Sequence, residues 1–193
     1  MKPRTHTIRI ALAQINCTVG DLQGNRDTIV YFIQRAKKAG ADIIAFPELA
    51  ITGYPPEDLL LKPKFIDDNR GMLRDLATYI EKDIVVIVGF VDRQGKDIFN
   101  AAAVLYRKKI QGVYHKMLLP NYGVFDEKRY FKAGSNPCIF SAGDITFGVN
   151  ICEDIWHKDG PVKEQATAGA ELILNINSSP YHMGKIKERE ELI

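Results

Sequence analysis

Hydrophobic and polar residues follow each other along the chain in a pattern that switches between strand-like and helix-like periods. An apolar run over residues 8–14 predicts a buried strand, and apolar side chains at helical spacing follow over residues 25–39. Gly40 ends this predicted helix, as glycine often does just past a helix C-terminus. Residues 42–46 then predict a second strand.

The rest of the chain repeats this alternation. A helix is predicted to begin at Pro55-Pro56, ahead of two acids, and to continue after an interruption at Pro63 to about Ile80. Residues 116–137 have weak periodicity, and a loop of that length in a compact domain is usually functional. The other expected elements are strands or hairpin arms over 84–90, 102–106, 112–115, 139–140, 145–149 and 172–176, and helices over 162–168 and 185–193.

Two helix-to-strand units with hairpins between them predict a layered α/β domain with a mixed sheet. Residues 39–44 resemble residues 168–173, and both segments suggest a helix end, a tight turn, an acid and a strand. We find no linker, so residues 1–193 are expected to form one domain. The chain stops within a predicted helix, and we therefore expect the domain to be incomplete on its C-terminal side.

Charge and cysteine content narrow the class of protein. A formal net charge of +2 gives no electrostatic argument for binding nucleic acid or a membrane surface. The basic start of the chain is not followed by a signal-peptide core. Three widely spaced cysteines without a CxxC motif argue against a disulfide framework or a zinc site and favour a reducing cytoplasm. No phosphate-binding loop is present, so nucleotide binding by this chain is not expected.

Cys152 is the first residue that could carry chemistry. It directly follows an apolar strand and precedes a predicted helix, a position where we expect a thiol to be exposed enough to react. The alternative is a buried structural cysteine. Cys17 and Cys138 have no acidic neighbours and fit that structural alternative better.

Glu48 and Lys116 are the other two candidates. Glu48 lies at the mouth of an apolar strand, where a partly desolvated carboxylate suits general acid–base work. Lys116 ends a strand and opens the long loop, where a fixed positive charge could stabilise an oxyanion. Taken alone, Glu48 could equally be a capping or salt-bridged residue and Lys116 a solvated one.

The order and context of these residues are more specific than any one of them. Three segments resemble the signature segments of the nitrilase superfamily, and they span residues 47–54, 115–120 and 150–156. Their flanks at residues 54–60, 121–131 and 177–185 resemble the NAD synthetase branch of that superfamily. The resemblance implies an α-β-β-α sandwich. It also implies further strands and an ATP-dependent synthetase domain that this chain does not contain.

The resemblance further implies a glutaminase, with L-glutamine as substrate. Cys152 would be the nucleophile, Glu48 the general base and Lys116 the oxyanion donor, and Glu127 would support Lys116. No metal or organic cofactor is implied for this step, while ATP and Mg²⁺ would belong to the synthetase domain. A homo-oligomer is also implied. The implied substrate contacts are Tyr54, Tyr122 and Phe125, which would shape the pocket, and Glu153, Ser179 and Lys185, which would hold the charged ends of glutamine.

Two other functions stay open at this point. A stand-alone amidase of the same superfamily would share the chemistry and differ in substrate. A non-catalytic scaffold would keep the fold and leave Cys152 unreactive. The three aromatic side chains could also be ordinary core residues, and an incomplete domain could fold and still be inactive.

Overall fold

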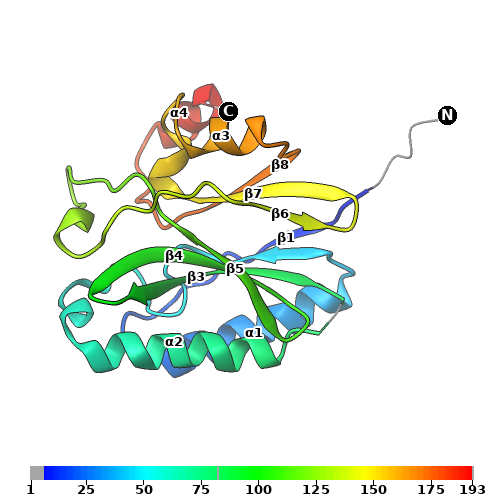
Figure 1. Ribbon diagram of the computed structural model, residues 1–193, viewed down its shortest axis with the longest axis horizontal. Helices are drawn as coiled ribbons and strands as arrows, with labels where there is room; N and C mark the ends of the chain where they lie inside the picture. The colour runs from blue at the N-terminus through cyan, green and yellow to red at the C-terminus, as the bar shows by residue number, and fades with distance from the viewer. Residues whose placement is uncertain (1–6, 82, 193) are drawn as a thin grey trace.

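The computed structural model describes residues 7–81 and 83–192 and forms four layers (Figure 1). Two β-sheets lie face to face. Helices α1 (Leu22–Lys38) and α2 (Pro63–Thr78) cover the outer face of one sheet, and α3 (Pro161–Thr167) and α4 (Lys185–Leu192) lie on the outer side of the other. The predicted α-β-β-α sandwich is therefore confirmed. The basic residues before Thr7, and Ile193, lie outside the described residues.

The larger sheet has five strands in the order in which they occur along the chain. The first three are parallel and are connected through α1 and α2, and the last two are antiparallel hairpin arms. Their bounds are β1 (Ile10–Leu12), β2 (Ile43–Ala45), β3 (Val85–Gln94), β4 (Asp97–Tyr106) and β5 (Lys109–His115).

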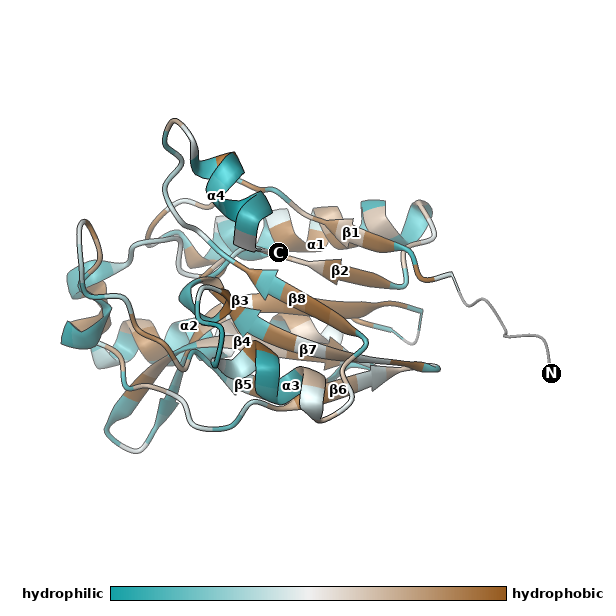
Figure 2. Ribbon diagram, turned by 90° about the horizontal axis from the view of Figure 1, so that it is seen from above, coloured by the Kyte–Doolittle hydropathy of each residue, from teal (hydrophilic) through white to brown (hydrophobic). Residues whose placement is uncertain are grey.

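The smaller sheet has three strands, β6 (Ile139–Ala142), β7 (Ile145–Ile151) and β8 (Leu172–Ile176). β6 and β7 form an antiparallel hairpin, and α3 connects β7 to the parallel strand β8. Both sheets are therefore mixed, as the pattern predicts. Figure 2 shows that the strands are largely hydrophobic, whereas α4 is hydrophilic along most of its length.

The continuous apolar run in β3 explains why the larger sheet is covered on both faces. Val86, Val88 and Phe90 pack in the core beneath α1 and α2. Val85 and Ile87 point the other way and pack in the core shared with the smaller sheet. Because successive side chains of a strand point to opposite faces, a strand that is apolar at every position needs partners on both sides.

Some elements differ from the predicted ones. The helix expected from Pro55 is a short 3₁₀ helix, Glu57–Leu61, and α2 begins separately at Pro63. Proline suits this first helical position because its missing N–H has no partner there in any helix. The long segment over 116–137 contains only one 3₁₀ turn, Glu127–Arg129. Within residues 7–81 and 83–192, no helix is long and apolar enough to cross a membrane.

Candidate active site

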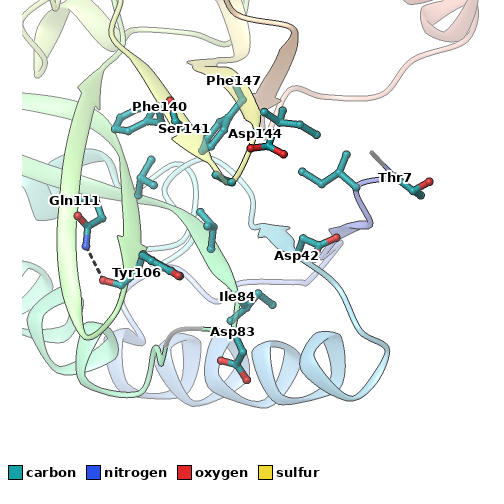
Figure 3. A pocket seen from close by; sticks show the side chains of 16 residues that line it. Thr7, Asp42, Asp83, Ile84, Tyr106, Gln111, Phe140, Ser141, Asp144 and Phe147 are labelled. Atoms are coloured by element: carbon teal, nitrogen blue, oxygen red, sulfur yellow. Dashed lines mark hydrogen bonds between the residues drawn. The ribbon is translucent and has the colours of Figure 1, made fainter. Parts of the chain in front are cut away.

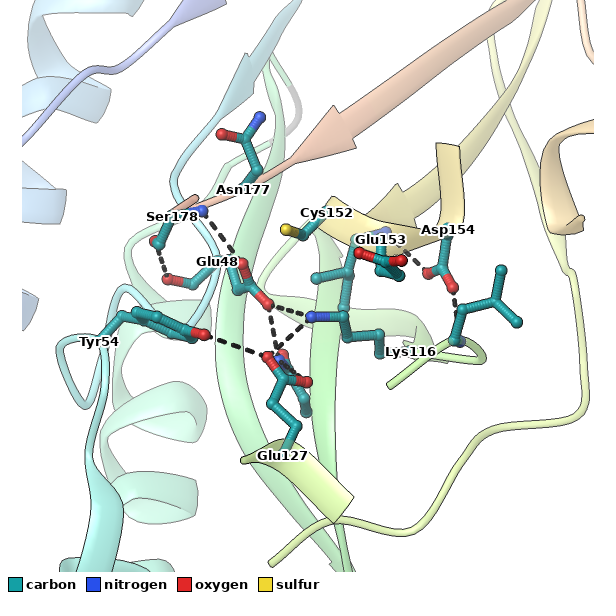
Figure 4. A network of polar contacts seen from close by, with 12 residues as sticks. Glu48, Tyr54, Lys116, Glu127, Cys152, Glu153, Asp154, Asn177 and Ser178 are labelled. Atoms are coloured by element: carbon teal, nitrogen blue, oxygen red, sulfur yellow. Dashed lines mark hydrogen bonds and ion pairs between the residues drawn. The ribbon is translucent and has the colours of Figure 1, made fainter. Parts of the chain in front are cut away.

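The three candidate residues follow the ends of three strands. Glu48 lies just past β2, Lys116 directly follows β5, and Cys152 directly follows β7. β2 and β5 point in the same direction, because β3 is parallel to β2 and the two hairpin turns reverse the direction twice. Side chains from both sheets therefore meet at one end of the sandwich, where Cys152 lies beside Glu48 and Lys116 (Figure 4).

Lys116 is held between two buried carboxylates. Its Nζ lies 2.7 Å from Glu48 Oε1 and 2.8 Å from Glu127 Oε1. Lys116 is fully buried, and Glu48 and Glu127 are nearly so. Burial lowers the pKa of Lys116, but the charges of Glu48 and Glu127 outweigh burial and leave that pKa raised. The ammonium is therefore retained, in the contact with Glu127 that the family resemblance implies.

Two residues that sequence reasoning missed hold the Glu48 carboxylate. The Asn100 amide donates to Glu48 Oε1 at 2.8 Å and is 3.5 Å from Glu127 Oε2. The Ser178 backbone N–H donates to Glu48 Oε2 at 3.0 Å. A polar residue inside the apolar strand β4 was the available signal for Asn100. Together with Lys116, these donors fix both oxygens of Glu48.

The backbone around Glu48 lies tightly against β3. A side chain at Gly89 would overlap the backbone from Pro47 to Leu49. A side chain at Gly134 would overlap the carbonyl of His115, next to Lys116. Glycine at these two positions lets the chain pass close enough to place the carboxylate and the ammonium together.

Cys152 occupies a strained turn. Its φ is 45°, in the left-handed region that side chains other than glycine rarely adopt, at a typical cost of about 1–3 kcal/mol. The expectation that this cysteine is exposed is wrong, since only 4% of its surface is accessible. The turn instead directs Cys152 to a cavity of about 190 Å³, which is also lined by Ile155, Trp156, Asn175, Asn177, Ser179 and Arg189.

The surroundings of the thiol keep it protonated at rest. Burial raises the pKa of Cys152, the Glu48 carboxylate raises it further, and the Lys116 ammonium opposes both. The pKa of Glu127 is raised to about 7, first by burial and then by the charge of Glu48, against the attraction of Lys116. A neutral thiol needs a base before it can attack, and among the neighbouring charged groups Glu48 has the strongest effect on this thiol.

Three aromatic residues lie near the carboxylates of Glu127 and Glu153, namely Tyr54, Tyr122 and Phe125. The Tyr54 hydroxyl donates to Glu127 Oε1 at 3.3 Å, and the Tyr122 hydroxyl donates to Glu153 Oε2 at 2.8 Å. Tyr122 packs edge-on against Phe125, with 5.7 Å between ring centroids. Because Tyr122 is 60% exposed, core packing is excluded for this residue. Tyr54 and Phe125 also line a cavity of about 250 Å³ that reaches Glu127.

The remaining predicted contacts lie near Trp156. Ser179 lines the cavity at Cys152 and accepts a hydrogen bond of 2.7 Å from Arg189. The Lys185 ammonium lies 4.1 Å from the centre of the Trp156 ring and 3.1 Å from Glu188. Sequence reasoning missed Arg189 because a charged helical tail normally indicates a solvated surface.

A larger cavity, of about 600 Å³, lies elsewhere between the sheets (Figure 3). It is lined by the start of β3, by Tyr106 and by the β6–β7 hairpin, and Glu48, Lys116 and Cys152 do not line it. A choice of site by cavity volume alone would therefore have missed these three residues. Among the side chains that the structure describes, no three His, Cys, Asp or Glu residues gather in a way that could hold a metal ion.

Comparison with known proteins shows that the chain is similar to part of several glutamine-dependent NAD⁺ synthetases. It is 44% identical to the enzyme of Thermotoga maritima over 191 residues and 42% identical to that of Aquifex aeolicus over 187 residues. These matches cover 96% of this chain but only 32% and 33% of the relatives. The chain thus spans about a third of the length of the curated relatives that it matches.

Solved structures agree with these matches. The glutamine-dependent NAD⁺ synthetase of Acinetobacter baumannii superimposes with a TM-score of 0.86 at 40% identity, over 95% of this chain and 34% of that one. An amidase from Nesterenkonia superimposes with a TM-score of 0.81 at 26% identity, over 93% of this chain and 68% of its own. The carbon-nitrogen hydrolase family model matches residues 9–193. The chain therefore belongs to the carbon-nitrogen hydrolase family.

Proposed function

We propose that this chain is the glutaminase part of a glutamine-dependent NAD⁺ synthetase. It would hydrolyse the side-chain amide of L-glutamine and release ammonia. The observation that carries the proposal is the buried Lys116 ammonium bridging Glu48 and Glu127 beside the Cys152 turn. The high identity to NAD⁺ synthetases across almost the whole chain supports glutamine as the substrate.

Acylation begins with proton transfer from the Cys152 thiol to the Glu48 carboxylate. The thiolate sulfur bonds to the amide carbon, and the electron pair of the C=O bond moves onto the oxygen. When the tetrahedral intermediate collapses, the C–N bond breaks and Glu48 returns the proton to the departing nitrogen. The products are ammonia and a thioester on Cys152.

Deacylation reuses the same carboxylate. Glu48 takes a proton from a water molecule, whose oxygen bonds to the thioester carbon. Collapse of this second intermediate breaks the C–S bond, and the sulfur recovers the proton from Glu48. Glutamate leaves with its new carboxyl group ionised in solvent, and the free thiol is restored.

The oxyanion of both intermediates would be held by Lys116 and by a backbone N–H near Glu153. The two carboxylates already fix the Lys116 ammonium, so little reorganisation accompanies the reaction. Removing one such donor typically lowers the rate about 10²–10³-fold. Glu127 transfers no proton in this scheme and would orient Lys116.

The substrate would lie in the cavity that Cys152 lines. Glu153 would bind the α-amino group, and Ser179 and Lys185 the α-carboxylate. Tyr54, Tyr122 and Phe125 would shape the adjoining side of the site, next to Glu127 and Glu153. Lys185 supplies a point charge where an arginine would bind a carboxylate through two parallel hydrogen bonds. The Lys185 ammonium lies over the ring of Trp156, which lines this cavity.

The glutaminase step needs no metal or organic cofactor, because the thiol, carboxylate and ammonium account for every proton and electron pair. ATP and Mg²⁺ would act in a synthetase domain, which would use the ammonia to amidate deamido-NAD. We also propose a cytoplasmic homo-oligomer without nucleic-acid or membrane partners.

Cys152→Ala tests the proposal in a protein that joins this chain to the synthetase domain. NAD⁺ synthesis from glutamine should disappear, while synthesis from added ammonia should continue. Cys138→Ala is the matched control and should keep both activities. If Cys152→Ala retains glutamine-driven synthesis, Cys152 is not the nucleophile, and the proposal is wrong.

A second candidate function is hydrolysis of another small amide. The likeness to the Nesterenkonia amidase favours it, since a variant of that enzyme carries acrylamide joined by Michael addition to its active-site cysteine. Rates on glutamine and on simple aliphatic amides separate the two functions.

A non-catalytic scaffold predicts that Cys152 is not labelled by the glutamine-like electrophile diazo-oxo-norleucine.

A further inference from the structure

Asp154 is a fully buried carboxylate that none of the proposed steps uses. It lies two residues past Cys152, in the 3₁₀ turn that follows β7. Its Oδ1 accepts hydrogen bonds from the backbone N–H groups of Met117 at 3.1 Å and Leu118 at 2.8 Å. Its Oδ2 accepts from the Ile151 N–H at 3.0 Å and the Tyr114 hydroxyl at 2.8 Å.

These four donors belong to residues that lie close in the sequence to Lys116 or to Cys152. Tyr114 precedes Lys116 by two positions, and Met117 and Leu118 follow it directly. Ile151 immediately precedes Cys152. Because β5 and β7 belong to different sheets, this single carboxylate connects the two halves of the sandwich at the place where thiol and ammonium meet (Figure 4).

The bond to Ile151 also bears on the strained turn. An acid at the third position of a helical turn that accepts from the N–H preceding the turn forms half of a capping box. It closes the loop around Cys152, whose φ of 45° needs support from its surroundings. Burial raises the pKa of Asp154, whereas the hydrogen bonds from Ile151 and Tyr114 act in the opposite direction.

We propose that Asp154 is a positioning residue that sets the placement of the Cys152 thiol relative to the Lys116 ammonium. This inference rests on the proposed role of Cys152 as the nucleophile. A carboxylate is suited to the task because both of its oxygens accept hydrogen bonds, so it can bind the Cys152 turn with one oxygen and the backbone after Lys116 with the other. An amide of the same shape accepts at one atom only.

Alkylation by iodoacetamide measures this placement without requiring glutamine. The Cys152 sulfur displaces iodide and forms a thioether, and its proton leaves through Glu48 to solvent. Peptide mass spectrometry gives the rate at each cysteine separately. In Asp154→Asn, the amide nitrogen must face backbone N–H donors on one of its two sides. We therefore expect labelling of Cys152 to slow by up to about 100-fold, the scale of a misplacement of about 1 Å.

The sign of the change separates positioning from charge. Loss of a negative charge near the thiol favours the thiolate and would by itself speed alkylation. Tyr114→Phe removes one of the four donors. It should also slow the labelling of Cys152, but by less than Asp154→Asn does. Asn69→Ala removes an equally buried polar side chain, which binds the Val91 backbone under α2, and should leave the Cys152 rate unchanged.

Cys17 and Cys138 report on the rest of the fold in the same samples. The inference predicts that their labelling stays at the wild-type rate and that kcat for glutamine falls while KM changes little. Unchanged labelling of Cys152 in both Asp154→Asn and Tyr114→Phe would overturn the inference. A rise in the labelling rates of Cys17 and Cys138 in these variants would also overturn it, because the change would then extend beyond the Cys152 turn. If wild-type Cys152 does not react, the proposed nucleophile is wrong, and this inference falls with it.

Discussion

Glu127→Gln changes the charge of the buried cluster while nearly preserving its shape. Glu48 and Glu127 lie against one ammonium, so the three ionised groups together carry one excess negative charge inside the protein. Burial, followed by the charge of Glu48, raises the pKa of Glu127 from 4.5 to about 7. Glutamine keeps an oxygen for Lys116 and removes the titrating carboxyl.

The raised pKa fixes the sign of the pH dependence. Between about pH 4.5 and 7, the folded protein holds a proton at Glu127 that the unfolded chain releases. The stability that Glu127 contributes is therefore fully present below pH 4.5 and is lost as the pH rises through 7. The change in the free energy of unfolding over this window is about 3 kcal/mol.

Urea unfolding at a series of pH values measures this difference. Between about pH 4.5 and about pH 8, the wild-type protein should lose about 3 kcal/mol of stability relative to Glu127→Gln. Glu164→Gln is the control, because it makes the same charge change at an exposed position on α3. If wild type and Glu127→Gln give parallel stability curves, the carboxyl does not titrate in this window, and the reasoning about the cluster fails.

Three other substitutions test separate parts of the site. Lys116→Met leaves two buried carboxylates without their cation and should destabilise the fold by about 3–5 kcal/mol at neutral pH, but by less in acid, where Glu127 gains a proton; equal urea midpoints would contradict this. Asn100→Leu removes the amide donor from Glu48 and should cost about 1–3 kcal/mol and lower kcat for glutamine, whereas an unchanged kcat would show that Lys116 and Ser178 suffice. Tyr122→Phe should raise KM for glutamine by about tenfold at most and leave urea unfolding unaltered, because the ring is exposed; a large loss of stability would show instead that Tyr122 is a core residue.

The sequence pattern predicted most of the fold because buried strands and helix faces leave a local periodicity. The strand over residues 172–176 has the predicted bounds, and the pattern also predicted both elements flanking Gly40. The prediction failed at segments whose hydrophobic residues do not follow a regular helical or strand period. The 3₁₀ turn after Pro56 is one example, and the part of β3 beyond Phe90, where polar residues begin, is another.

The partners of the reactive groups could not be predicted in the same way. Ser178 lies 130 residues from Glu48, and Asn100 lies 52 residues away, so their contacts depend on sheet register and on how the sheets stack. Burial of Cys152 has the same cause, since the cavity around it includes Asn177 and Arg189 from beyond β8. Local sequence located the end of a strand but could not show what covers it.

The close passage of the chain over Gly89 has a consequence for any effort to alter substrate preference. Random mutagenesis of this domain should show position 89 to be as intolerant as position 48, although it offers no side chain to a ligand. A methyl group there would displace the segment that carries Glu48. Mutant libraries aimed at new amide substrates should therefore vary positions such as Tyr122 and Arg189 and keep Gly89 unchanged.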